Sequence, residues 1–122
     1  MSVKAYLEIT MTINPDKRPA AAKVYTDYRQ PFLDTIEGAL TKELLVRDED
    51  VQVIHGFDSM EHAKAYLETK MFQDDVVAGL KPTWAGDPDI RFYEYQVYLR
   101  LLKLNGLKSF CKLFFPFSKV DT

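Results

Sequence analysis

The chain has 122 residues, of which 47% are hydrophobic and 28% are charged, with a net charge of −2. This composition is typical of one soluble globular domain and excludes a disordered or fibrous protein. Cys111 is the only cysteine, so no disulfide can close within the chain and no cysteine-based metal site can form.

The charge is unevenly distributed along the chain. Residues 99–122 contain five basic side chains and one acidic side chain, a net +4, which leaves −6 on residues 1–98. Because phosphate neutralisation needs a broad basic face, we expect no nucleic-acid partner.

The first ten residues lack the features of a signal peptide, and no apolar run approaches the roughly 18 residues of a membrane span. We therefore expect a cytoplasmic protein.

The chain begins with the pattern of a strand followed by a helix. Apolar and polar side chains alternate from Val3 to Ile13, which predicts a strand with one buried face. Residues 14–19 interrupt this pattern, and Asp16 is the expected cap of the following helix. Pro31 lies inside that helix, so we expect either one kinked helix or two shorter ones. Gly38 is a natural stop for this helix. Its apolar side chains recur at three- and four-residue steps: Ala21, Val24, Tyr25, Tyr28, Phe32, Leu33, Ile36 and Leu40.

The next segments predict a hairpin, a second helix and a last strand. Residues 42–47 and 51–57 are two expected strands joined by an acidic turn. Residues 58–80 have the pattern of a helix, with Asp58 as its cap and Glu61 completing a capping box. The aromatic and β-branched residues in the segment 90–99 predict the last strand.

This order predicts an α+β, ferredoxin-like βαββαβ fold over residues 1–98, a four-stranded antiparallel sheet with two helices on one face. The last strand places Ile90 and Phe92 on one side and Tyr93 and Tyr95 on the other. Monomers rarely expose such an aromatic surface, so we expect a homodimer in which a second copy covers the open face.

The element order, with the spacing of Phe57, Ser59, Glu61, Tyr66, Leu67 and Phe72, resembles the dimeric α+β barrel superfamily, which includes antibiotic-biosynthesis monooxygenases and haem-degrading enzymes. The resemblance covers residues 3–98. It implies a homodimer whose sheets close a barrel, with a ligand cavity between sheet and helices. The haem-degrading members carry a histidine where this chain has Val76, so we expect neither haem nor another cofactor.

His55 is the candidate catalytic residue. It alternates with Val51, Val53 and Phe57, so its side chain should lie on the apolar side of its strand. Two interpretations remain open: a hydrogen-bonded core or interface histidine, or a neutral imidazole that accepts a proton in the cavity, since its ordinary pKa of about 6.5 lies near neutrality. The spacing of the two histidines fits no common zinc pattern, so we expect no metal site.

Six further side chains are candidates for binding a small aromatic ligand: Tyr25, Tyr28, Arg29, Tyr66, Phe72 and Trp84. The aromatic members serve equally well as core packing, and Arg29 equally well as a solvated residue at the edge of its helix.

Residues 99–122 form an expected extension with a short helix before Pro116. Packing on the acidic dimer, or on a partner protein, suits that helix better than a membrane surface.

Together these patterns favour a homodimeric, cofactor-independent monooxygenase in which His55 deprotonates an aromatic or polycyclic substrate. The alternative is a non-catalytic ligand-binding or assembly module whose interior is filled by side chains. A cavity of several hundred Å³ beside His55 would favour the enzyme.

Overall fold

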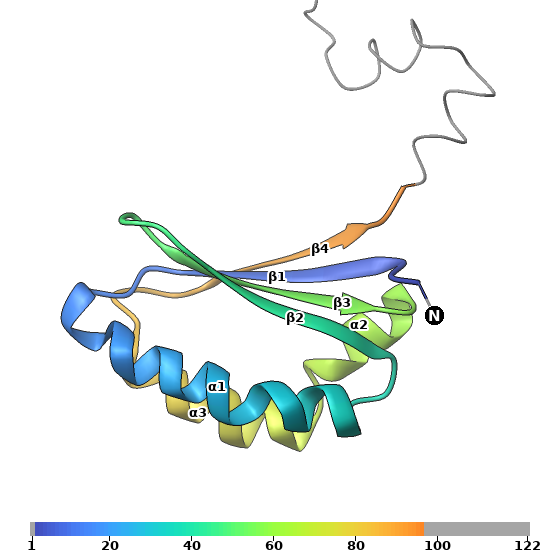
Figure 1. Ribbon diagram of the computed structural model, residues 1–122, viewed down its shortest axis with the longest axis horizontal. Helices are drawn as coiled ribbons and strands as arrows, with labels where there is room; N and C mark the ends of the chain where they lie inside the picture. The colour runs from blue at the N-terminus through green and yellow to red at the C-terminus, as the bar shows by residue number, and fades with distance from the viewer. Residues whose placement is uncertain (1, 97–122) are drawn as a thin grey trace, which may run out of the picture.

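The computed structural model describes residues 2–96, which form one antiparallel sheet covered on one face by helices (Figure 1). The strands are β1 (Ala5–Met11), β2 (Ala39–Val46), β3 (Val51–Phe57) and β4 (Asp89–Glu94), in the order β2-β3-β1-β4. The covering helices are α1 (Arg18–Thr35), α2 (Met60–Tyr66) and α3 (Val77–Leu80). This is the predicted ferredoxin-like α+β fold, which is confirmed.

The alternation of β1 and β3 determines which side chains enter the core. β1 lies between β3 and β4, with Leu7 opposite His55 on one side and Phe92 on the other. Every second residue of β1 is buried beneath the helices, whereas the residues between them are half-buried on the opposite face. Because β3 follows the same alternation, Val51, Val53 and His55 share the helix-covered face.

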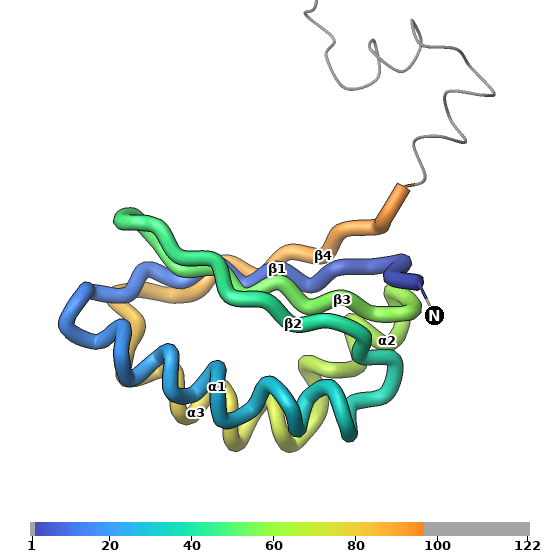
Figure 2. The backbone as a smooth tube through the Cα atoms, viewed as in Figure 1, coloured from blue at the N-terminus to red at the C-terminus, as the bar shows by residue number. Residues whose placement is uncertain are grey.

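α1 runs as one continuous helix through Pro31 (Figure 2), so of the two alternatives the pair of shorter helices is wrong. The fully buried Phe32, directly after the proline, packs this part of the helix against the sheet and offsets the lost backbone hydrogen bond. Asp16 does not cap the helix; it lies in a preceding 3₁₀ turn, η1 (Pro15–Lys17), and α1 has no side-chain cap. Leu40 belongs to β2 and not to the helix stripe.

The predicted helix over residues 58–80 is interrupted. α2 ends at Tyr66, and a π-helical segment, η2 (Met71–Val76), then leads into α3 and a 3₁₀ turn, η3 (Lys81–Thr83). The physical reason is Thr69, whose hydroxyl donates to the Tyr66 carbonyl (2.7 Å) and accepts from the Phe72 N–H (3.2 Å). This hydroxyl ends one helix and caps the next.

The cap of α2 also differs from the prediction. Ser59 is the N-cap, and its hydroxyl accepts from the backbone N–H of His62 at 3.1 Å. Asp58 instead binds the His62 ring, and Glu61 lies in the first turn without completing a capping box. A serine two residues after Phe57 reaches the free N–H groups of the helix better than the aspartate does.

The predicted acidic turn between β2 and β3 is confirmed. The Arg47 N–H donates to the Asp50 carbonyl at 3.0 Å, and the Arg47 guanidinium donates to both carboxylate oxygens of Asp50. β4 ends at Glu94, so the expected last strand is too long at Tyr95 and Gln96, and its remaining part at 97–99 lies outside the described residues. The domain boundary at residue 98 and the helix before Pro116 also lie outside them.

Candidate functional site

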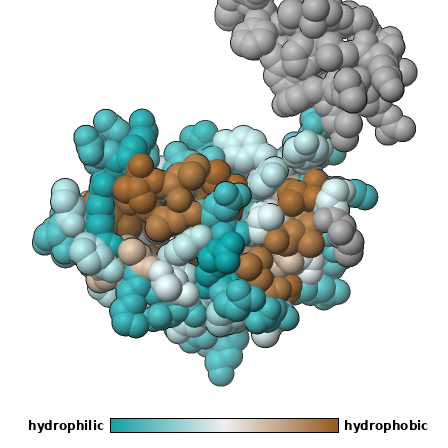
Figure 3. All heavy atoms as spheres, viewed as in Figure 1, coloured by the Kyte–Doolittle hydropathy of each residue, from teal (hydrophilic) through white to brown (hydrophobic). Residues whose placement is uncertain are grey.

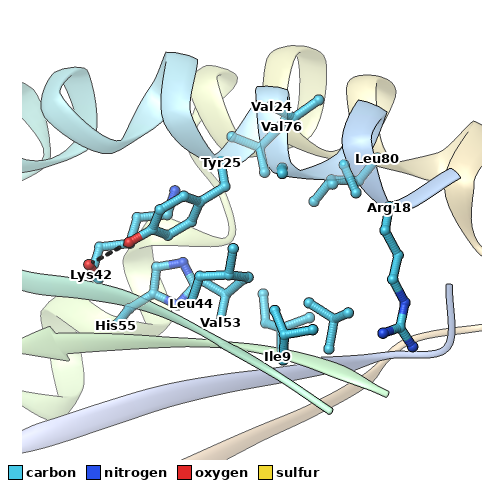
Figure 4. A pocket seen from close by; sticks show the side chains of 14 residues that line it. Ile9, Arg18, Val24, Tyr25, Lys42, Leu44, Val53, His55, Val76 and Leu80 are labelled. Carbon is cyan, nitrogen blue, oxygen red and sulfur yellow. Dashed lines mark hydrogen bonds between the residues drawn. The ribbon is translucent and has the colours of Figure 1, made fainter. Parts of the chain in front are cut away.

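A cavity of about 110 Å³ lies between α1 and the helix-covered face of β2 and β3 (Figure 4). Most of its wall is aliphatic: Ile9, Ala21, Ala22, Val24, Leu44, Val46, Val51, Val53, Val76 and Leu80. Four polar side chains complete the lining: Arg18, Tyr25, Lys42 and His55. Apolar side chains are visible at the surface between α1 and the sheet (Figure 3). Val46, which lines the cavity, is 60% exposed. The cavity is therefore an apolar space with a few polar groups, as ligand sites usually are.

Lys42 and His55 lie side by side because of the hairpin register. β2 and β3 pair so that Lys42 is directly opposite His55. Both side chains are on the helix-covered face, and each is only 2% exposed. The short turn after Val46 fixes this register, so the hairpin alone places an amine beside an imidazole.

The environment of His55 keeps its imidazole neutral. Nδ1 lies 3.1 Å from the Leu7 carbonyl oxygen, and because a carbonyl can only accept, Nδ1 carries the hydrogen and Nε2 has the free lone pair. Burial, together with the smaller effect of the positive charge of Lys42, lowers the pKa of His55 to about 3, although the Leu7 hydrogen bond acts in the opposite direction. The imidazole is therefore oriented, neutral and weakly basic.

Lys42 is a buried amine without a carboxylate partner among residues 2–96. Its Nζ lies 5.0 Å from the centre of the Phe32 ring and 5.9 Å from that of Tyr25. Burial lowers its pKa to about 8, with a further contribution from the positive charge of Arg29. Its own carbonyl accepts from the Tyr25 hydroxyl (2.9 Å) and from Arg29 Nε (3.0 Å), so α1 holds this point of β2 firmly (Figure 4).

The structure brings only some of the sequence-predicted residues together. His55 and Tyr25 line the cavity. Arg29 reaches this region through the Lys42 carbonyl only, and Tyr28 is half-buried on α1 against the core. Trp84 lies elsewhere, where it forms a bridge with Ile13.

Tyr66 and Phe72 are core residues behind His55. Their ring centres are 5.1 Å apart, and the Tyr66 ring lies 5.5 Å from that of His55 and 4.9 Å from that of Phe32. Neither lines the cavity. The Tyr66 hydroxyl is buried without a hydrogen-bond partner in the described part of the chain, and burial raises its pKa.

Lys42 is the site residue that sequence reasoning missed. The signal that could have found it is the spacing Lys42, Leu44, Val46, which places the lysine on the apolar side of β2. The four-residue connection 47–50 then puts it opposite His55.

Residues 2–96 contain neither a group of side chains arranged for a metal ion nor a helix suited to cross a membrane. No group of three or more His, Cys, Asp or Glu side chains there is arranged to hold a metal ion. None of the helices in this range combines the length and apolar composition that a bilayer crossing requires.

No family model matches the sequence, and no curated protein matches it. Several solved structures share its fold. A "putative antibiotic biosynthesis monooxygenase" from Caulobacter crescentus is 22% identical, with a TM-score of 0.68 over 78% of this chain and 92% of that chain. A protein of the same description from Nitrosomonas europaea is 13% identical, with a TM-score of 0.64 over 78% and 93%. A conserved protein from Methanosarcina mazei is 10% identical, with a TM-score of 0.67 over 77% and 94%.

These likenesses confirm the predicted ferredoxin-like α+β fold, which this chain shares with the two monooxygenase-like structures. At such low identity they assign no residue a role.

Proposed function

We propose that this protein is a homodimeric, cofactor-independent monooxygenase that binds a one-ring aromatic substrate between α1 and the sheet. The observation that carries the proposal is an apolar cavity beside the oriented, neutral imidazole of His55. The names of the structural neighbours support the reaction class.

The cavity is smaller than the several hundred Å³ expected beside His55 for an enzyme, so its size limits the proposed substrate to a small molecule. It measures about 110 Å³, whereas an engineered cavity of about 150 Å³ in another protein holds benzene. A single ring with part of its edge in the opening fits this space, and a polycyclic molecule does not.

His55 is the proton acceptor in this proposal. Oxygenation without a cofactor needs an electron-rich anion, and a phenolic ring becomes one when its hydroxyl proton is lost. Nε2 of His55 is a free acceptor because Nδ1 is bound to the Leu7 carbonyl. A negative charge developing on the ring oxygen raises the low pKa of His55 and so favours the transfer. Dioxygen then takes four electrons from the ring, leaving one oxygen atom on a ring carbon as a quinone carbonyl and releasing the other as water.

Oxygen uptake with a panel of one-ring phenols tests this function. Wild-type protein should consume oxygen in step with substrate loss, and His55→Asn should lower kcat by about 100-fold or more, the usual contribution of a general base. His62→Asn is the matched control because His62 lies at the start of α2 and does not line the cavity. Unchanged turnover in His55→Asn would remove His55 from the mechanism. Tight binding of the phenols without any oxygen uptake would instead favour the ligand-binding module.

The open face of the sheet supports the dimer in this proposal. Leu45, Tyr93 and Tyr95 are 50%, 45% and 52% exposed. Near them lies a shallow hollow lined by Tyr6, Glu8, Glu43, Ile54 and Tyr93. A second copy would bury these rings.

Light scattering at micromolar concentration should give twice the 14.1 kDa mass of one chain. Tyr93→Glu should dissociate the dimer, because it places a third carboxylate beside Glu8 and Glu43. Thr26→Glu, on the exposed side of α1, should leave it intact. A monomeric wild-type protein would contradict this part of the proposal.

A further inference from the structure

In residues 2–96, several exposed basic side chains bind carboxylates, whereas the buried Lys42 binds none. Lys23, Arg47 and Arg91 each bind a carboxylate, although all three are exposed and water could solvate them. Lys42, which is 2% exposed, is bound to no carboxylate in the same part of the chain. A buried lysine is normally paired, because an isolated buried charge is costly.

The surroundings of Lys42 compensate only part of this cost. The rings of Phe32 and Tyr25 lie within reach of a cation–π contact. No aspartate or glutamate lines the cavity, and the other buried polar side chain there is the neutral His55. Lys42 is therefore the buried positive charge of the cavity, while Arg18 also lines it and Arg29 lies near enough to act on Lys42. In apolar surroundings the low dielectric strengthens the attraction for an anion.

We propose that Lys42 makes this cavity selective for one-ring anions, a phenolate or an aromatic carboxylate, whose charged oxygen binds the lysine ammonium. The inference rests on the proposed function for the aromatic nature of the ligand and adds the charge that the ligand carries. The ring lies among the aliphatic side chains of α1 and the sheet, and its oxygen lies at the junction of β2 and β3.

The position of His55 fits the same ligand. Because Lys42 and His55 are directly opposite each other, an oxygen bound to the amine also lies near the imidazole. A phenol that enters in its protonated form can release its proton toward Nε2 while Lys42 stabilises the resulting anion. Lys42 thereby determines the charge of the ligand, and His55 is the nearest acceptor for its proton.

4-Nitrophenol is a direct probe of this selectivity, because its anion is yellow and its protonated form is nearly colourless. Wild-type protein should lower the pKa of the bound probe by about 1–3 units, the usual effect of an opposite charge at close range. Lys42→Met should bind the probe without this lowering. Lys64→Met, which removes an exposed lysine of α2, should behave as the wild type.

A second experiment compares the binding of benzoate and benzamide, because these two molecules have nearly the same shape and differ in charge. Calorimetry should show that wild-type protein prefers benzoate by about tenfold or more, equivalent to about 1.4 kcal/mol, and that Lys42→Met loses this preference. Comparing benzoate with 4-nitrophenol identifies which anion binds more tightly. Equal binding of benzoate and benzamide, an unshifted pKa of the probe, or no binding of any probe would overturn the proposal. None of these measurements uses oxygen, so a failure of the oxygenase assay is distinguishable from a failure of anion selectivity.

Discussion

Replacing Lys42 with methionine should stabilise the protein near neutral pH, and the gain should disappear at alkaline pH. The pKa of Lys42 is lowered from 10.5 to about 8, mainly by burial. The difference of about 2.5 between these two pKa values corresponds to roughly 3–4 kcal/mol, at about 1.4 kcal/mol for each pKa unit. Methionine has a similar shape without the charge, so it removes this cost and keeps the packing against Phe32.

The sign of the pH dependence follows from proton binding. Below about pH 8 the lysine is charged in both the folded and the unfolded chain, so the folded protein bears the full cost. Between about pH 8 and pH 10.5 the unfolded chain binds more protons, so the free energy of unfolding of the wild type rises toward that of Lys42→Met. Tyr66, whose pKa is raised by burial, also affects stability at high pH. Its effect cancels because both proteins contain it.

Urea unfolding from about pH 7 to about pH 10.5 measures this difference, with equal m-values showing that both proteins unfold in the same way. Lys64→Met controls for the general loss of one positive charge on the surface. A difference between wild type and Lys42→Met that does not change with pH would refute the reasoning. So would a Lys42→Met variant that is less stable at neutral pH, because it would show that the amine has a stabilising partner.

Three further predictions concern individual residues. In the wild type, the folded pKa of His55 is about 3, so below about pH 6.5 only the unfolded chain takes up a proton at this residue and the free energy of unfolding falls. His55→Asn, which keeps a donor for the Leu7 carbonyl, should show a smaller fall. Urea unfolding measured from neutral to acid pH checks this. Gly38→Ala should cost roughly 1–3 kcal/mol in the same assay, since Gly38 has φ +81° and its new Cβ would collide with side chains, whereas Gly86→Ala meets nothing within 4 Å and should cost little. Tyr66→Phe should leave thermal stability unchanged or higher, because it removes a buried hydroxyl without a partner; a marked fall in Tm would reveal a partner for that hydroxyl.

The strands were predictable wherever one face is buried and the other is not. β3 runs from Val51 to Phe57 as predicted, because its alternation is strict and an acidic turn precedes it. β2 begins at Ala39, three residues earlier than predicted, since the chain turns at Gly38 and pairs with β3 at once. The break after Tyr66 was not predictable from periodicity. Phe72 lies in a π-helical segment and is buried, and its spacing from Tyr66 also fits the apolar stripe of one continuous α-helix.

The ligand-binding candidates were less predictable, since helical spacing gives the direction of a side chain and not its depth or neighbours. Tyr25 lines the cavity and Phe72 does not, although both lie on apolar helix stripes. The strand residues carry more information. His55 was placed correctly on the buried face of β3 by alternation alone, and the same alternation places Lys42 on that face of β2. A charged side chain at a position where the pattern requires an apolar one is costly to the fold, so its presence points to a ligand more strongly than an aromatic residue in the same place does.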